Sequence, residues 1–132
     1  MVEVIGHRGA STEAPENTLA ANDLAFQQKA DGIEVDVRLT KDNRLVCMHD
    51  KSAFRTAGKK SLIKESTLNQ LKSLDVGKWK GEKWSGEAIP SLHEVLSEMP
   101  LDKKIFIDVK EGIETIDPLI EDIQKNKLDP KY

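Results

Sequence analysis

Apolar residues recur along this chain at two spacings, every second position in some segments and every third or fourth in others. The first spacing is typical of strands and the second of helices. We predict strands at residues 2–7, 33–39, 44–49 and 103–110. We predict helices at residues 18–30, 91–99 and 113–123, and a shorter helical piece at 66–74. Strands that alternate with helices form βα units, so an α/β fold with four parallel strands is expected.

Two segments show these patterns most clearly. The apolar face of the second predicted strand consists of Ile33, Val35, Val37 and Leu39. Its polar face consists of Glu34, Asp36 and Arg38, because successive side chains of a strand point to opposite sides. Near the C-terminal end, a spacing of three and four predicts an amphipathic helix through Ile113, Ile116, Ile120 and Ile123.

Between residues 51 and 88 the periodic pattern weakens. This segment is rich in Lys, Gly and Ser, and it contains Trp79 and Trp84. A long irregular segment in a compact domain is often a lid or a binding loop, so we expect a small cap insertion here. Tryptophans in such a loop more often pack against it than contact a substrate, and both roles stay open for these two.

Composition narrows the classes of function. The chain has 132 residues, the usual size of one domain, and we treat residues 1–132 as a single domain. The formal net charge is −3 without a long block of one sign, which argues against nucleic-acid binding. No stretch approaches the ~20 apolar residues of a membrane span, and no signal peptide is visible. Cys47 is the one cysteine, so no intrachain disulfide can form, and its position between Val46 and Met48 predicts a buried thiol. Together with the absence of a visible signal peptide, this predicts a reducing, cytoplasmic location.

Ionisable side chains occur at or near the end of every predicted strand. They are His7 and Arg8, Glu34 and Asp36, His49 and Asp50, and Asp108 and Lys110. The carboxyl ends of strands are where α/β proteins carry out their chemistry. A lone histidine at a strand end is usually structural, and a charged strand face is often only a wet face. The coincidence of four such strand ends nevertheless predicts a functional site.

The carboxylates predict a metal site. Glu34 and Asp36 are two positions apart on one strand, so their Cα atoms lie ~7 Å apart and both side chains face one pocket. Two such carboxylates repel each other unless a cation or a proton lies between them. Asp108 on a neighbouring strand can supply a third. Carboxylate oxygens with water suit Mg²⁺ or Ca²⁺ better than zinc.

The remaining residues predict a phosphate ester as the small-molecule substrate. Arg8 and Lys110 would bring positive charge to the carboxylates, which fits an anionic phosphate ester. His7 and His49 form a candidate acid/base pair. The alternative for Lys110 is a surface ion pair with Asp108, which would be worth little energetically.

The sequence resembles a known family, the glycerophosphodiester phosphodiesterases. The resemblance lies in HRGASTEAPENT at 7–18, GIEVDVRLTKDNRLVCMHD at 32–50 and FIDVK at 106–110, and also in RTAG at 55–58 and IPSLHEVL at 89–96. It implies a TIM (β/α)8 barrel, a divalent cation (Mg²⁺ or Ca²⁺), and hydrolysis of glycerophosphodiesters to glycerol 3-phosphate and an alcohol. The mechanism that it implies begins with attack of a substrate hydroxyl on phosphorus, and water then opens the resulting cyclic phosphate.

The resemblance also implies roles for individual residues. The implied acid/base pair is His7 and His49, and the implied metal ligands are Glu34, Asp36 and Asp108. The implied phosphate contacts are Arg8 and Lys110, and the implied supporting residues are Glu16 and Asn17. Asp108 departs from the family, which commonly has a glutamate there. An aspartate is one methylene shorter, so either the metal moves or this ligand acts through water. Residues 51–88 match the cap insertion of the family.

The chain is short for this family, because a TIM barrel needs ~250 residues. We therefore expect about half a barrel, the N-terminal half, and hence a fragment of a longer protein. Otherwise self-association or a partner chain must complete the barrel. Two alternative functions stay open. One is a lipid phosphodiesterase of the sphingomyelinase D type, which shares this site plan, and the other is a non-catalytic half-barrel.

Overall fold

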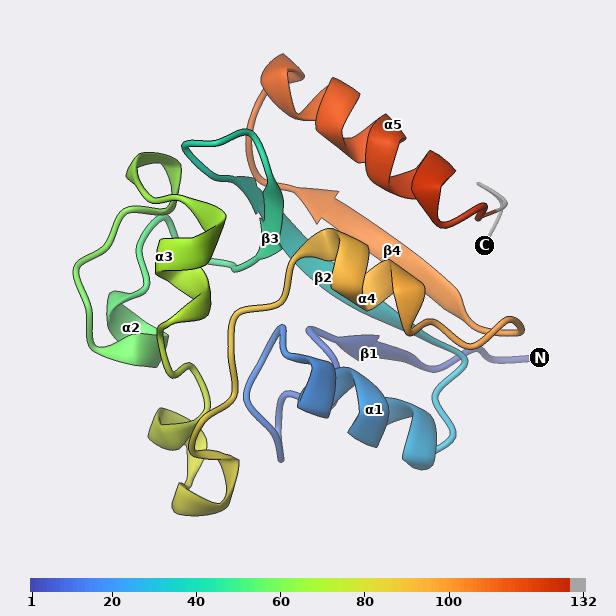
Figure 1. Ribbon diagram of the computed structural model, residues 1–132. Helices are drawn as coiled ribbons and strands as arrows, with labels where there is room; N and C mark the ends of the chain where they lie inside the picture. Colours follow the sequence, from blue (N-terminus) through green and yellow to red (C-terminus); the bar gives the residue numbers. More distant parts are fainter. Residues whose placement is uncertain (129–132) are drawn as a thin grey trace.

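The computed structural model describes residues 1–128 (Figure 1). Its strands are β1 (Ile5–His7), β2 (Gly32–Leu39), β3 (Leu45–Cys47) and β4 (Lys104–Val109). Its α-helices are α1 (Leu19–Gln27), α2 (Phe54–Ala57), α3 (Leu68–Lys72), α4 (Leu92–Ser97) and α5 (Ile116–Lys125). Short 3-10 helices are η1 (Ile63–Glu65), η2 (Lys78–Lys80), η3 (Glu82–Trp84) and η4 (Ile113–Thr115). Each predicted strand and helix is present, with small shifts of its ends.

The four strands form one sheet in which β2 pairs with each of the other three. β1 and β4 run parallel to β2, and the register places His7 beside Glu34 and Asp108 beside Asp36. β3 runs antiparallel to β2, so the prediction of four parallel strands is wrong for this strand. The reason is the connection, residues 40–44. A parallel crossover needs about a dozen residues or more, so a chain this short can only turn back as a hairpin.

The helices α1, α4 and α5 lie on one side of the sheet (Figure 1). The core beneath them contains the apolar side chains of β2 together with residues of α1 and α4. Its buried members include Ala25, Ile33, Val35, Val37, Leu92, Val95 and Leu96. The alternating pattern of β2 therefore directs its apolar face to the helices and leaves the face with Glu34 and Asp36 on the other side.

The predicted C-terminal helix is present as α5, but only part of its predicted apolar face packs against the core. Leu119 and Ile123 of α5 pack against the core. Ile113, Ile116 and Ile120 are exposed instead. A spacing of three and four identifies a helix, but the elements that pack against it decide which residues are covered. Within residues 1–128, α5 contacts α4, and these three isoleucines face away from the core.

Residues 51–88 are more ordered than their weak pattern indicates. The predicted helical piece is present as α3, which begins with a capping box between Thr67 and Gln70. The segment also closes over a second apolar cluster, whose buried members are Val46, Met48, Ala53, Ile63, Leu71, Val76 and Ile89. Because this cluster includes Val46 of β3, the segment packs directly against the strand that leads to His49.

Cys47 is buried in the first core, as predicted. Burial raises the pKa of its thiol, so the residue behaves as a small apolar side chain. No helix within residues 1–128 has the length and apolar character needed to cross a membrane.

Candidate functional site

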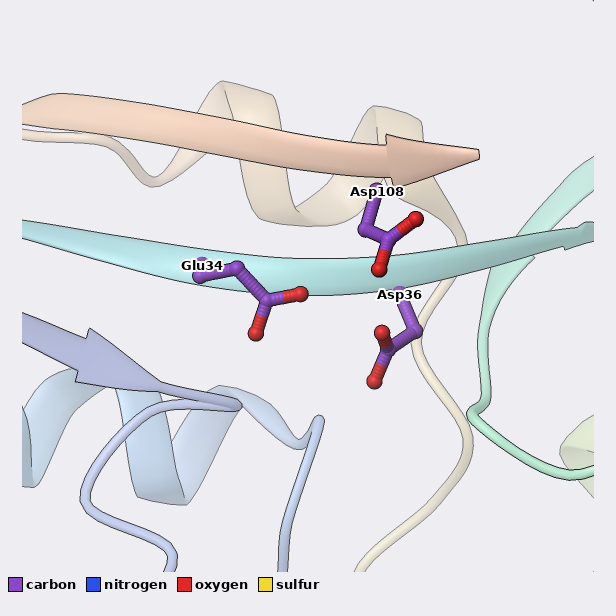
Figure 2. A group of neighbouring side chains, drawn as sticks. All are labelled: Glu34, Asp36 and Asp108. Carbon is purple, nitrogen blue, oxygen red and sulfur yellow. The ribbon is translucent and has the colours of Figure 1, made fainter. Parts of the chain in front are cut away.

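Three carboxylates meet on the charged side of the sheet, two from β2 and one from β4 (Figure 2). Glu34, Asp36 and Asp108 each place one oxygen within 4.8 Å of the other two. The grouping follows from two spacings, because Glu34 and Asp36 are two positions apart and Asp108 is the register neighbour of Asp36. Three such oxygens are a donor set that Mg²⁺ or Ca²⁺ can bind. The predicted grouping is therefore present, and the role of these residues as metal ligands stays a prediction.

Asp36 is the most enclosed of the three, with 2% of its side chain exposed. Asn17 Nδ2 donates to Asp36 Oδ2 at 3.0 Å, and the Asp36 N–H donates to Asn17 Oδ1 at 3.2 Å. Arg8 Nε lies 3.1 Å from Asp36 Oδ2, and Lys110 Nζ lies 3.6 Å from Asp36 Oδ1. Burial alone would raise the pKa of Asp36, but these partners outweigh burial and hold the pKa below its ordinary value. Asp36 is thus kept as a carboxylate.

The pKa of Glu34 is shifted in the opposite direction from that of Asp36. Burial, and then the neighbouring charge of Asp36, raise the pKa of Glu34 above its ordinary value. Its Oε2 accepts a hydrogen bond from the Arg8 N–H at 3.2 Å and lies 3.7 Å from His7 Nε2. The side chain of His7 is 70% exposed, so its ring is open to solvent. A cation between Glu34 and Asp36 would relieve the repulsion that raises the pKa of Glu34.

The third carboxylate is more open than the other two. The side chain of Asp108 is 49% exposed and pairs with Lys110 Nζ at 2.9 Å. The hydrogen bond to Asp108, together with the charge of Asp36, raises the pKa of Lys110. Lys110 thus lies between two of the three carboxylates and brings a positive charge to the cluster.

The loop after β1 positions the two predicted supporting residues. Asn17 has a φ of 56°, and its N–H donates to the Arg8 carbonyl at 2.9 Å. Gly9 has a φ of 77°, and a Cβ at this position would lie 2.6 Å from the backbone of α1, so the loop needs a glycine there. Glu16 Oε2 lies 3.2 Å from Arg8 Nη1. Asn17 therefore supports Asp36, and Glu16 supports Arg8.

His49 follows β3 and is held by its neighbours at both its backbone and its ring. Arg38 Nε and Nη2 donate to the His49 carbonyl at 2.9 and 2.7 Å. His49 Nδ1 lies 2.8 Å from Asp50 Oδ1. Arg55 of α2 donates through Nε to Asp50 Oδ2 at 2.9 Å and through Nη1 to Glu16 Oε1 at 2.8 Å. These contacts connect the end of β3 to the loop after β1.

Comparison with known proteins assigns the chain to a family. The sequence model of the glycerophosphoryl diester phosphodiesterase family matches residues 7–129. The chain belongs to this family. It is similar to the glycerophosphodiester phosphodiesterase of Caldanaerobacter subterraneus subsp. tengcongensis, with 48% identity over 112 residues. That match covers 83% of this chain and 46% of the relative.

Two solved structures of glycerophosphodiester and related phosphodiesterases share the fold. The glycerophosphodiester phosphodiesterase of Agrobacterium tumefaciens gives a TM-score of 0.90 and 31% identity, covering 96% of this chain and 54% of that one. A phosphodiesterase of Oleispira antarctica, solved with the product sn-glycerol-3-phosphate, gives 0.89 and 37%, covering 96% and 53%. The chain thus has the TIM-barrel fold of this family and spans about half the length of these relatives, or about half a barrel.

Within this family fold, Asp50 contacts His49 and Arg55 contacts Glu16, although no role was predicted for Asp50 or Arg55. The sequence offers one signal for each, a carboxylate directly after His49 and an arginine in the RTAG segment. The contact between Arg55 and Glu16 joins residues 39 positions apart. No spacing rule for strands or helices reaches that far, so only the folded chain reveals this contact.

Proposed function

We propose that this chain is the part of a glycerophosphodiester phosphodiesterase that carries the metal ligands and the acid/base pair. The reaction is hydrolysis of a glycerophosphodiester to glycerol 3-phosphate and an alcohol. The observation that carries the proposal is the cluster of Glu34, Asp36 and Asp108 beside Arg8 and Lys110, in a chain of this family. A relative at 48% identity bears the name of this activity, and a similar structure holds sn-glycerol-3-phosphate as its product. Both support the substrate class.

Glu34, Asp36 and Asp108 would hold one divalent cation, either Mg²⁺ or Ca²⁺. The donor set fits such a cation because it consists of carboxylate oxygens within 4.8 Å of one another, without sulfur or nitrogen. When bound, the cation would withdraw charge from a phosphoryl oxygen of the substrate. Because Asp108 replaces the longer glutamate, the choice between the two metals has to be measured.

Arg8 and Lys110 would orient the phosphate. Arg8 Nε and Lys110 Nζ lie 3.1 and 3.6 Å from the two oxygens of Asp36, so their charges converge on the carboxylate cluster. An anionic phosphodiester at this place would gain charge-assisted hydrogen bonds from both side chains. Their removal should therefore weaken substrate binding.

His7 and His49 would move the protons. One ring removes the proton of the attacking substrate hydroxyl, and the other donates a proton to the oxygen of the leaving alcohol. One water molecule then opens the cyclic phosphate, which gives glycerol 3-phosphate. His7 is open to solvent beside Glu34, which supports contact with a substrate. His49 has its Nδ1 beside Asp50, which leaves its Nε2 for proton transfer.

Residues 51–88 would form a cap beside the pocket and contribute to the choice of the alcohol. Their packing against the strand that leads to His49 supports this role. A second copy of the chain, or further chain of the same protein, would complete the barrel. The cytoplasmic location stays a prediction from the sequence.

The proposal is tested by measuring glycerol 3-phosphate release from glycerophosphocholine by this chain, with Mg²⁺, with Ca²⁺ and with a chelator. We expect release that requires a divalent cation. Absence of release in a sample that binds the metal would show that this chain alone is a non-catalytic half-barrel, and the same assay on the longer protein would then test the proposal. Choline release from sphingomyelin in place of glycerophosphocholine turnover would favour the sphingomyelinase D-like alternative.

A histidine variant tests the acid/base assignment separately. We expect His49→Ala to abolish turnover while the metal affinity, measured by calorimetry, stays nearly the same. His93→Ala is the matched control, because His93 lies on α4 and contacts Asn126 instead of the site. Equal turnover in His49→Ala and the wild type would sink the assignment.

A further inference from the structure

Arg55 connects the end of β3 to the loop after β1 through two carboxylates. On one side, Arg55 Nε donates to Asp50 Oδ2 at 2.9 Å and Nη2 donates to Asp50 Oδ1 at 3.1 Å. On the other side, Nη1 donates to Glu16 Oε1 at 2.8 Å and Nη2 donates to Glu16 Oε2 at 2.9 Å. Both contacts are bidentate pairs, in which a planar guanidinium meets a planar carboxylate in a fixed geometry.

Each of these carboxylates contacts a residue of the proposed site. Asp50 Oδ1 lies 2.8 Å from His49 Nδ1. Glu16 Oε2 lies 3.2 Å from Arg8 Nη1, the arginine that would orient the phosphate. Arg55 therefore reaches one proposed proton-transfer group and one proposed phosphate contact, each through a single carboxylate.

We propose that Arg55 is a positioning residue that fixes the tautomer of His49 and the place of Arg8 through Asp50 and Glu16. An ionised carboxylate can only accept hydrogen bonds, so Asp50 requires the proton on His49 Nδ1. The neutral ring then has its lone pair on Nε2, the nitrogen that can act as a base. Without the bidentate hold of Arg55, the Asp50 carboxylate can rotate and the ring can take either tautomer. The inference rests on the proposed function for the roles of His49 and Arg8.

The contacts from Asp50 through Arg55 to Glu16 form a bridge between the end of β3 and the loop after β1. The charges of this bridge support the proposed arrangement. Hydrogen bonds from Arg55, and then from His49, hold the pKa of Asp50 at about 2, so this carboxylate stays ionised in neutral and mildly acidic solution. Burial would raise the pKa of Glu16, but Arg55 and Arg8 together outweigh burial and hold that pKa below its ordinary value. The carboxylates of Asp50 and Glu16 thus balance the guanidinium groups of Arg55 and Arg8, and Asp50 lies beside the His49 ring.

The bridge restricts geometry more than it adds stability. The side chain of Arg55 is 41% exposed, so its ion pairs add little to the free energy of unfolding. The Trp79 ring lies over its guanidinium, with 5.7 Å between Arg55 Cζ and the ring centroid. Trp79 Nε1 in turn donates to the Val76 carbonyl at 2.9 Å. The loop that carries Trp79 thus restrains Arg55 within the same segment, and Trp79 serves the site by packing on this arginine.

The test reads the ring nitrogens of His49 by ¹⁵N NMR, which requires no turnover. The chain has three histidines, so His7→Gln and His93→Gln variants suffice to assign the signals. At a pH where the ring is neutral, we expect the wild type to hold the Nδ1–H tautomer. Arg55→Lys keeps the charge but loses the bidentate geometry, so we expect Nδ1–H to become the minor form. Arg44→Lys, the same change in the hairpin between β2 and β3, should leave the His49 signals unchanged.

Two results would overturn the inference. One is a neutral wild-type ring with its proton on Nε2, a reading that does not depend on how any variant folds. The other is an Arg55→Lys variant that keeps the wild-type tautomer while its backbone spectrum shows a folded chain. If the tautomer shifts in a chain that releases no glycerol 3-phosphate, the inference is supported although this chain alone is not catalytic. In an active chain, Arg55→Lys should lower kcat by about 100-fold and change KM less.

Discussion

Asp36 and Asp108 are register neighbours on paired strands, but their surroundings differ. Asp36 on β2 is buried and lies against Asn17, Arg8 and Lys110. Asp108 on β4 is half exposed, and its ion pair is with Lys110. The fold therefore fixes the β2 side of the proposed metal site, whereas the β4 side can adjust to a bound cation.

The apolar residues show a similar contrast between the region formed by β1, β2 and β3 and the region formed by β4 and α5. Ile33 of β2 is fully buried, whereas Ile120 of α5 is 48% exposed and Phe106 of β4 is also exposed. Within residues 1–128, β4 pairs with β2 alone, so its other edge has no strand partner there. The β4–α5 region thus covers part of the core of β2 through residues such as Ile107 and Leu119, and it leaves several of its own apolar residues to solvent.

The largest expected effect comes from removing the buried carboxylate. Asp36→Ala leaves Arg8 Nε and the Asn17 amide without their partner in a buried place, although Arg8 Nη1 keeps Glu16. Breaking a buried charge pair in this way costs about 3–5 kcal/mol of the free energy of unfolding. Urea denaturation in the presence of a chelator measures this cost without any contribution from a metal.

Asp108→Ala is the matched control for that variant. Its carboxylate is half exposed, so its loss should cost about 1 kcal/mol or less. Both variants should lose most of their metal affinity in calorimetry, since each removes one proposed ligand. Equal losses of stability would show that the two sides of the site do not differ as described.

A second pair of variants tests the contrast between the apolar residues. Ile33→Ala in the buried core of β2 should cost about 2–5 kcal/mol in urea denaturation. Ile120→Ala on the exposed side of α5 should stay within about 0.5 kcal/mol of the wild type. A large loss in Ile120→Ala would mean that this side of α5 is covered in solution, for example by a second copy of the chain.

The positions of the strands, and the faces of β2, could be predicted because a strand has a period of two residues. The same rule places Glu34 and Asp36 together, and the alternation of strands with helices brings Asp108 beside them. The direction of β3 depends on the length of a connection, residues 40–44, which is a different signal from periodicity. A connection of that length by itself indicates an antiparallel hairpin.

Other features could not be predicted because they depend on contacts between distant segments. The periodicity of residues 113–123 identifies a helix, but the coverage of Ile120 depends on what packs against α5. The bridge from Asp50 through Arg55 to Glu16 requires that α2, the end of β3 and the loop after β1 come together in space. The spacing of residues along the chain does not predict contacts between segments this far apart.

Low pH should reduce the free energy of unfolding by protonating Asp50, which follows β3. Its folded pKa of about 2 lies below its ordinary value, so its stabilising contribution is complete above about pH 4 and is lost as the pH falls through about 2. Discounted for solvent screening, this contribution is about 1 kcal/mol. We expect the free energy of unfolding of the wild type to fall by that much more than that of Asp50→Asn between pH 5 and pH 2. Parallel curves for the two proteins in urea denaturation at each pH would contradict this.

The smallest expected effect is local and concerns Asp75, which organises the loop that carries Trp79. Its Oδ1 accepts hydrogen bonds from the N–H groups of Gly77 and Lys78 at 2.8 and 3.0 Å, and its Oδ2 accepts one from Gly86 at 2.9 Å. Backbone hydrogen bonds, that from Lys78 first, lower the pKa of Asp75 to about 2. We therefore expect Asp75→Ala to speed hydrogen exchange at these three amides, with little change at the core amides of β2.

Asp102→Ala, at an exposed aspartate in the turn before β4, is the control for Asp75→Ala and should leave exchange in the loop unchanged. If Asp75→Ala instead lowers protection throughout β2, the loop and the sheet unfold as one unit. Residues 51–88 would then unfold cooperatively with the sheet around β2. If the effect stays in the loop, the Trp79 ring can leave Arg55 while the sheet stays intact. Movement of Trp79 would then change the proposed restraint of His49 through Arg55 without disturbing the carboxylates of β2.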